Sequence, residues 1–340
     1  MGKVVVYDFR DRYAVIDLVD ELNTNHGFGA WDVRKTISAS DVARKLKNMR
    51  RIVWLIDSSV VDHGPYPTKS TGSVLICAKF MDYGDTRINA VSEIFKVHGN
   101  AVLAFYDEIG GFRVELIDAL GNVWFNGFNM RLLASRIVEF VDWSKRSVLV
   151  RSYLKKETAL IASSEVDRFL KIVRSASDKM MDSDVGRYFG SVSTRCQALF
   201  PSMSGGDTVL SSARDICKKH ISAQDMIRVE AGNGGVIAYG ERKPSVDAPI
   251  HLELYMLYEN IKFLIHGHAY IEGCPTTVNY MSCGDMREIL EVENIVEDKK
   301  CSFMCVNLRN HGFIVGADTL EKLDEWLETA VFVQHQGEIK

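Results

Sequence analysis

The sequence predicts a mixed α/β protein of two domains, and three observations lead to this prediction. Strand-like and helix-like segments alternate through the first half of the chain. A polar and charged stretch at 152–157 then precedes a long amphipathic helix, which we expect over residues 164–181. The second half carries apolar strands that end in turns rich in histidine and glycine. We therefore expect one domain over residues 1–152 and a second over residues 153–340.

Short, continuous apolar runs of the first half are typical of strands buried on both faces of a parallel sheet. Alternation of these runs with helical spacing indicates a sheet layered by helices. The expected strands are 3–9, 51–57, 73–80, 100–106 and 147–150, with a hairpin formed by 112–117 and 122–125, and the expected helices are 13–22, 40–49, 86–97 and 130–141.

The loop over residues 58–71 follows one of these buried strands, at the end where open α/β sheets bind ligands. It is either a small-molecule or phosphate pocket or an ordinary polar loop, and the sequence does not decide between them. No G-x-G-x-x-G follows the first strand, and no G-x-x-x-x-G-K-[ST] occurs in the chain. A dinucleotide or P-loop site therefore has no motif to support it.

Composition narrows the class of protein. The chain has 340 residues, 46% hydrophobic and 25% charged, which is typical of a globular protein. Its net charge of −4 gives no broad basic field, so we expect no nucleic-acid partner. No apolar run approaches the roughly 18 residues of a membrane span, so we expect no membrane association. The 7 cysteines are scattered and lack a C-x-x-C pair, which favours reduced thiols and a cytoplasmic location.

The second half contains a candidate metal site. An apolar strand, 261–265, ends in His266-Gly267-His268. Residues two apart on a strand point to the same side, so both imidazoles can reach one ion. Ordinary hydrogen-bonding histidines are the alternative. A second apolar strand, 302–308, leads to Asn310-His311-Gly312, and a helix over 319–332 follows.

A carboxylate completes this candidate set. Asp247 lies at the junction between a loop and the helix expected over 248–258. Together with the histidines it forms a plausible zinc site that keeps an open position. Asp247 can equally cap the helix, since aspartate is a preferred N-cap residue. Upstream of it we expect a helix over 215–221 and a hairpin made by 225–230 and 236–239 around Asn233-Gly234.

These motifs resemble the class II aldolase/adducin family, which includes fuculose-phosphate and rhamnulose-phosphate aldolases and ribulose-5-phosphate 4-epimerase. The resemblance is carried by Pro244-Ser245-Val246-Asp247 followed by His251, by His266-Gly267-His268, and by Asn310-His311-Gly312. It covers about residues 167–331 and not the first half. It implies a class II aldolase-like α/β domain with a central, mostly antiparallel sheet.

The resemblance also implies a set of residues that hold the substrate or its phosphate. Residues 189–195 resemble the family's G-N-x-S-x-R strand, with Ser191 where the family usually has asparagine, and residues 201–206 stand where it has a T-P-S-G turn. Plain turns are the alternative for both loops. The implied substrate- or phosphate-binding residues are Gly190, Ser191, Ser204, Gly205 and Ser245.

By the same resemblance, His266, His268, His311 and Asp247 are metal ligands, and the ion is Zn²⁺ or another divalent metal. Asp247 is a fourth ligand or the catalytic base. Aspartate at this position is typical of the family's 4-epimerases, whereas its aldolases usually carry glutamate. His251, one helical turn later, is read as a supporting residue rather than a ligand.

The function that the resemblance implies is that of a metal-dependent aldolase (lyase) or 4-epimerase. Its substrate would be a small, phosphorylated keto-sugar or a related carbonyl compound, and its reaction would pass through a zinc-stabilised enediolate. The alternative is a non-catalytic, adducin-like protein that serves assembly or partner binding. The resemblance further implies a homo-oligomer, a tetramer in many members of the family.

Overall fold

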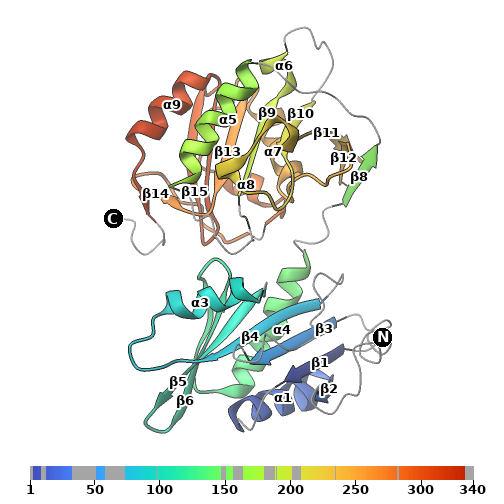
Figure 1. Ribbon diagram of the computed structural model, residues 1–340, viewed down its shortest axis with the longest axis vertical. Helices are drawn as coiled ribbons and strands as arrows, with labels where there is room; N and C mark the ends of the chain where they lie inside the picture. Colours follow the sequence, from blue (N-terminus) through green and yellow to red (C-terminus); the bar gives the residue numbers. More distant parts are fainter. Residues whose placement is uncertain are drawn as a thin grey trace. The chain divides into compact units, whose positions relative to one another are not determined.

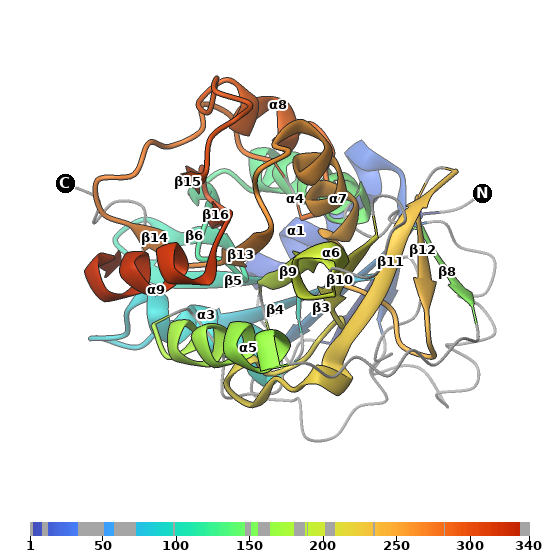
Figure 2. The ribbon, with the colours of Figure 1, turned by 90° about the horizontal axis from the view of Figure 1, so that it is seen from above.

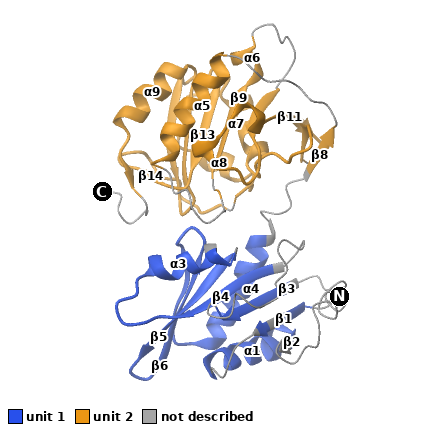
Figure 3. Cartoon of the chain, in the orientation of Figure 1, with its two compact units in different colours: residues 1–145 blue, residues 146–340 orange. Residues whose placement is uncertain are grey.

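The computed structural model divides the chain into two compact units, Met1–Lys145 and Arg146–Lys340 (Figure 3). Each unit is built around its own sheet and its own hydrophobic core. Within the described residues, no helix is long and apolar enough to cross a membrane. The structure describes residues 3–8, 13–32, 51–57, 73–97, 99–146, 151–155, 164–179, 188, 190–200, 208–233, 235–281 and 283–333.

The first unit contains a seven-stranded sheet of order β2-β1-β3-β4-β5-β6-β7. Its first five strands run parallel and its last two antiparallel, as the continuous apolar runs predict. The strands are β1 (Lys3–Asp8), β2 (Phe28–Asp32), β3 (Arg51–Asp57), β4 (Ser73–Phe80), β5 (Ala101–Glu108), β6 (Gly111–Asp118) and β7 (Val123–Gly127).

Helices cover both faces of this sheet. Helices α1 (Tyr13–His26) and α4 (Met130–Arg146) share one core cluster with alternate residues of β3, β4 and β5. Helix α3 (Arg87–Lys96) contacts β4 and β5 but lies outside that cluster, so it packs on the other face (Figure 1). The prediction of an α/β layered first half is confirmed.

The second unit contains an eight-stranded sheet of order β15-β16-β13-β9-β10-β11-β12-β8. Every neighbouring pair is antiparallel except β12 with β8, which confirms the expected mostly antiparallel sheet. The strands are β8 (Arg151–Lys155), β9 (Ser191–Arg195), β10 (Val209–Ser212), β11 (Met226–Gly232), β12 (Gly235–Tyr239), β13 (Phe263–Gly267), β15 (Phe303–Leu308) and β16 (Gly312–Ala317). A small second sheet pairs β14 (Tyr270–Ile271) with β17 (Phe332–Val333).

Four helices enclose the second sheet. Helices α5 (Ser164–Ser177) and α9 (Leu320–Thr329) contact each other on one side. Helices α7 (Ala248–Leu257) and α8 (Glu288–Glu293) contact each other on the opposite side (Figure 2). The very short helix α6 (Cys196–Leu199) follows β9 directly.

The chain segments that form the candidate site meet at one end of the strands β9, β13 and β16. Strand β13 runs between β9 and β16 and ends at His266-Gly267. The turn from β15 to β16 carries His311, followed by Gly312 at φ 131°. A Cβ atom on Gly312 would overlap the carbonyl oxygen of Gly267, so only glycine lets this turn approach β13 so closely.

Several expected elements differ from the structure. In place of a helix over 215–221 there is one 3₁₀ turn, η4 (Lys218–His220), because Arg214 donates its amide N–H to Lys243 O at 2.9 Å and Asp215 adopts φ 60°. The polar stretch expected to separate the domains contains β8, which pairs with β12. Strands β2 and β10 and helix α8 were not anticipated. The expected elements at 40–49 and 147–150, the loop 58–71 and the turn 201–206 lie outside the described residues.

Candidate metal centre

Three imidazoles converge at the end of β13 and the turn before β16. The rings of His266, His268 and His311 have centroids 4.8 to 5.2 Å apart. Each offers a nitrogen that lies within 4.8 Å of the other two. All three side chains are buried, with exposed fractions of 2%, 6% and 1%. Side chains from one strand end and one turn thus form a group that could hold a metal ion.

The hydrogen bonds of His266 determine which of its nitrogens can bind a metal. Its Nδ1 lies 2.8 Å from the carbonyl oxygen of Phe313 and must donate, because a carbonyl only accepts. The lone pair is therefore on Nε2, which is buried and has no hydrogen-bond partner among the described residues. Burial lowers the pKa of His266 to about 3, so the ring is neutral at pH 7. A buried, unpaired imidazole nitrogen fits a metal ligand.

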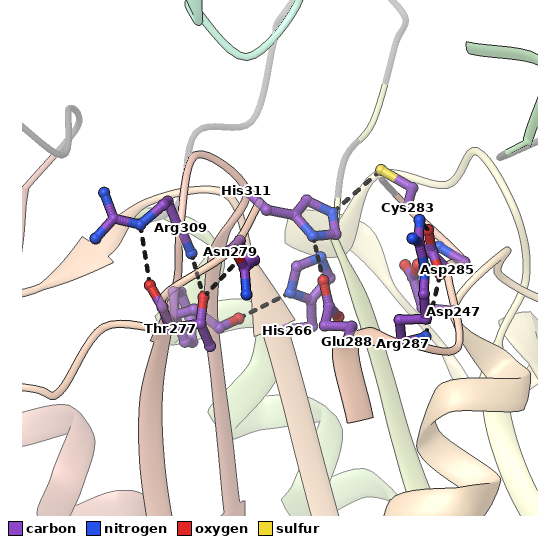
Figure 4. A network of polar contacts seen from close by, with 12 residues as sticks. Asp247, His266, Thr277, Asn279, Cys283, Asp285, Arg287, Glu288, Arg309 and His311 are labelled. Atoms are coloured by element: carbon purple, nitrogen blue, oxygen red, sulfur yellow. Dashed lines mark hydrogen bonds and ion pairs between the residues drawn. The ribbon is translucent and has the colours of Figure 1, made fainter. Parts of the chain in front are cut away.

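His311 is oriented by a carboxylate. Its Nδ1 donates to Oε2 of Glu288 at 2.7 Å, and Glu288 is itself buried at the start of α8 (Figure 4). Burial opposes charge on His311, but the neighbouring Cys283 and Glu288 raise its pKa well above the ordinary value. A carboxylate on the distal nitrogen fixes the tautomer and increases the basicity of Nε2 toward a metal. That Nε2 faces the Cys283 thiol, with Sγ at 3.1 Å.

Asp247 is held at this site and does not cap α7. Its side chain makes no capping hydrogen bond. Instead, Oδ1 accepts the amide N–H of Gly284 at 3.0 Å, and Oδ2 accepts the hydroxyls of Ser191 and Ser245, each at 3.3 Å. Burial opposes ionisation, yet the imidazoles of His266 and His311 keep the pKa of Asp247 below its ordinary value. A buried, ionised carboxylate beside the histidines is available for proton transfer.

A chain of polar groups extends from Asp247 into the core. Ser191 Oγ lies 3.2 Å from Nε2 of His251, and Ser193 Oγ lies 2.7 Å from its Nδ1. Ser193 also contacts the hydroxyl of Tyr255 at 3.0 Å. Burial lowers the pKa of His251 to about 4, so it is neutral. His251 is thus linked to Asp247 through Ser191, which contacts both.

The residues expected to hold the substrate have different environments. The Ser191 and Ser245 hydroxyls contact Asp247, as described above, and both side chains are buried. Gly190 adopts φ 76°, and a Cβ atom there would press on the carbonyl oxygen of His266. Its glycine is therefore explained by packing on β13. Ser204 and Gly205 lie outside the described residues.

Three residues at the site were missed from the sequence. Glu288 and Cys283 belong to no motif that the sequence analysis used. Their position between the two histidine segments is the one sequence feature that could have indicated them. The third is Arg214, in the turn after β10. Its Nε donates to Pro244 O at 3.3 Å, and its Nη2 is buried without a hydrogen-bond partner among the described residues. Burial lowers the pKa of Arg214, while the charge of Asp247 opposes that shift.

Arg195, by contrast, is bound to the chain itself. Its guanidinium donates to the carbonyl oxygens of Ile261, at 2.9 Å, and Tyr255. It also stacks over the Tyr255 ring at 5.1 Å. These contacts brace β9 against α7 and leave Arg195 with a structural explanation.

Part of the second unit matches a known protein family. Residues 171–271 match the sequence model of the family described as "Class II Aldolase and Adducin N-terminal domain". This range contains Asp247, His266 and His268 and ends before His311. The match confirms the resemblance to class II aldolases and adducin for residues 171–271.

Two solved structures are similar to about half of the chain. One is YgbL from Klebsiella pneumoniae, provisionally described as an aldolase, epimerase or decarboxylase, with 18% identity, TM-score 0.37, and coverage of 50% of this chain and 88% of that one. The other is an aldolase II superfamily protein from Pseudomonas syringae, with 15% identity, TM-score 0.35, and coverage of 49% and 72%.

Proposed function

We propose that the class II aldolase/adducin domain of this chain is a metal-dependent aldolase (lyase) or 4-epimerase that acts on a small, phosphorylated keto-sugar. The single observation that carries the proposal is the convergence of three buried imidazoles, one with a buried and unpaired nitrogen. Burying unpaired polar atoms costs about 1–3 kcal/mol each. In a protein that binds no ion there, this loss of stability would have no compensating interaction.

His266, His268 and His311 would hold the ion, most simply zinc, and Glu288 would fix the third imidazole. When bound, a divalent ion would act as a Lewis acid that polarises the substrate's carbonyl and stabilises negative charge developing on its oxygen. The protein's own contribution is to keep the His266 imidazole neutral, to orient His266 and His311 through their Nδ1 hydrogen bonds, and to shield all three rings from bulk water.

Asp247 would move the proton. Its carboxylate is ionised and held by Ser191, Ser245 and the Gly284 amide, so it can accept a proton without rearranging. His251 would hold Ser191 in place from behind. In this proposal the two serines position the base, and Ser245 also accepts the amide N–H of Asp247 at 3.3 Å.

The substrate's acidic end would be recognised beside Asp247. Arg214 supports this, because its buried Nη2 has donors to offer and no partner among the described residues. A guanidinium pairs well with phosphate or carboxylate oxygens. Gly190, Ser204 and Gly205 stay in the proposed binding set by resemblance alone.

The alternative is a non-catalytic, adducin-like protein in which the fold serves assembly. The unpaired His266 nitrogen favours the enzyme, since burying it without a partner costs stability that a scaffold without a ligand would not recover. Metal content distinguishes the two.

The test is elemental analysis of protein purified without a metal-affinity step. We expect about one zinc or other divalent ion per chain in the wild type and strong loss in His266→Ala. His220→Ala, an exposed histidine of the same unit, is the matched control and should keep the ion. Metal-free wild-type protein with unchanged metal uptake in His266→Ala would refute the proposal.

A further inference from the structure

We propose that Cys283 is a fourth protein ligand of the ion held by His266, His268 and His311. This inference rests on the proposed metal centre and specifies its donor set as three nitrogens and one sulfur. The observation behind it is the contact between Cys283 Sγ and His311 Nε2, at 3.1 Å. That nitrogen is the metal-binding one, because Nδ1 of the same ring is engaged by Glu288.

The distance agrees with two neighbouring ligands of one ion. Zn–N bonds of about 2.05 Å and Zn–S bonds of about 2.3 Å put the two donors roughly 3.5 Å apart in a tetrahedral site. The observed 3.1 Å is the hydrogen-bonded distance of a thiol and an imidazole nitrogen. To bind one ion, Cys283 Sγ and His311 Nε2 would have to move apart by only a few tenths of an ångström. The thiol would also have to rotate toward the three histidines, and the ion would then replace the thiol proton.

The segment before Cys283 is fixed to the turn that carries His311. Thr277 Oγ1 accepts the amide N–H of Arg309 at 2.7 Å, and its carbonyl oxygen accepts Arg309 Nε at 3.1 Å. Asn279 donates to Glu291 of α8 through both its amide N–H, at 2.9 Å, and its side chain, at 2.7 Å. Figure 4 shows the bonds between Thr277 and Arg309 near the histidines.

The segment after Cys283 is fixed as well. The amide N–H of Gly284 donates to Asp247 Oδ1 at 3.0 Å. Five residues later in the chain, Glu288 bonds His311 from the opposite side of its ring. Cys283 is therefore presented to the histidine group by bonds on both sides, which reduces the entropic cost of binding an ion.

Asp247 is less suited to the fourth position. Both of its oxygens already accept hydrogen bonds, one from a backbone amide and the other from two hydroxyls. Neither the Asp247 carboxylate nor Cys283 Sγ belongs to the group of donors that lie within 4.8 Å of one another, but Sγ lies 3.1 Å from one of its members, His311 Nε2. Ligation by Cys283 leaves Asp247 available as the base, which separates the two roles that the sequence left open.

A sulfur ligand changes which ions the site prefers. Thiolate favours zinc and cobalt over magnesium or manganese, which prefer oxygen donors. In a four-coordinate site, Cys283 would occupy the position that an open catalytic site leaves to water or substrate.

The test uses cobalt as a spectroscopic probe in the full chain. A thiolate bound to Co²⁺ gives an intense near-ultraviolet charge-transfer band, whereas imidazole ligation gives only weaker visible d–d bands. We expect both kinds of band in the wild type, and the d–d bands alone in Cys283→Ser. Cys301→Ser, which makes the same change at a cysteine outside the site, should match the wild type.

Two results would count against the inference in different ways. Visible d–d bands without a charge-transfer band in the wild type would overturn Cys283 as a ligand and leave the three-histidine centre intact. No cobalt spectrum in any of the three proteins would overturn the metal centre, and the proposed function with it. Because the decisive spectrum is that of the wild type, the test does not depend on Cys283→Ser folding.

Discussion

At the scale of single residues, Asp247 decides whether the site can do proton-transfer chemistry. Asp247→Asn keeps the shape and an acceptor for the Gly284 amide but removes the charge. Since Asp247 makes no capping bond, the helix should be unaffected. We expect turnover to fall at least about a hundredfold, the low end of general acid–base contributions.

The assay for this variant is a screen of phosphorylated ketoses for aldol cleavage and for epimerisation at C4. Ser222→Ala, a change at an exposed serine whose side chain contacts Asp225 and not the candidate site, serves as a handling control. Cleavage alone would assign an aldolase, and epimerisation alone a 4-epimerase. Wild-type turnover in Asp247→Asn would remove Asp247 from the mechanism.

His251 gives a second prediction, in the pH dependence of stability. Burial lowers its pKa in the folded protein to about 4, below the 6.5 of an exposed imidazole. Between these values the unfolded chain binds a proton that the folded chain does not, so stability falls as pH falls. From pH 7 to pH 5 this one group should cost about 2 kcal/mol.

The measurement is urea unfolding of the metal-free protein at pH 7 and pH 5, for the wild type and His251→Gln. Glutamine can still bond Ser191 or Ser193 but does not titrate. We expect the variant to lose about 2 kcal/mol less than the wild type over this range. Equal losses would mean that His251 is not buried as a neutral ring.

At the residue scale, the sequence predicts the residues that recognisable histidine motifs contain. The H-x-H pattern and the N-H-G turn predict three imidazoles in one place, and the structure brings them together. The sequence could not reveal the partner of each ring. Glu288 and Cys283 lie 23 and 28 residues before His311, and only the path of the intervening loop makes them neighbours.

At the scale of elements, the turn between β15 and β16 controls the site. Gly312 lies at φ 131°, and a Cβ there would overlap the backbone of Gly267 and His268. Gly312→Ala must therefore push His311 away from β13. We expect a loss of several kcal/mol in the free energy of unfolding, from strain of about 1–3 kcal/mol plus the clash, together with weaker metal binding.

Gly240→Ala is the matched control for this change. Gly240 has a similar φ of 127°, but a Cβ there would meet nothing within 4 Å. It should show the backbone strain alone and bind metal normally. Equal destabilisation and equal metal affinity in the two variants would mean that close approach of the turn is not what orders His311.

The elements themselves were predicted well where apolar periodicity is strong. Strands β3, β4 and β13 and helices α5 and α7 lie within a few residues of the expected ranges. The expected helix at 215–221 is wrong, because Asp215 adopts φ 60°, outside the helical range, directly after Ala213 and Arg214 pair with the Lys243-Pro244 segment. This contact joins residues about thirty positions apart, and the local pattern of residue types cannot predict such a contact.

At the scale of the whole molecule, resemblance to the class II aldolases predicts a homo-oligomer, a tetramer with the metal near a subunit interface. Within the described strands, the eight-stranded sheet ends at β15 and β8. The outer side of β15 is paired at Asn307 with the segment around Thr276, and no named strand lies beyond either end of the sheet. Open edges are available for pairing with another copy. Sedimentation velocity should give a mass near four chains, and a monomer at micromolar concentration would contradict the prediction.

The division of the chain into two units leads to the last prediction. Every proposed ligand and its supporting residues come from the second unit, whose core cluster shares no residue with that of the first. An ion that binds only the folded site stabilises that unit by mass action, about 2.7 kcal/mol at a free concentration of 100 times Kd. We expect zinc to slow amide hydrogen exchange in β13, β16 and α8, which bear or brace the ligands, and to leave β3, β4 and β5 unchanged. The same comparison in His266→Ala should show no zinc effect in either unit. Protection confined to the first unit would place the metal elsewhere, since binding energy appears in the part of the structure that must be folded for the ion to bind.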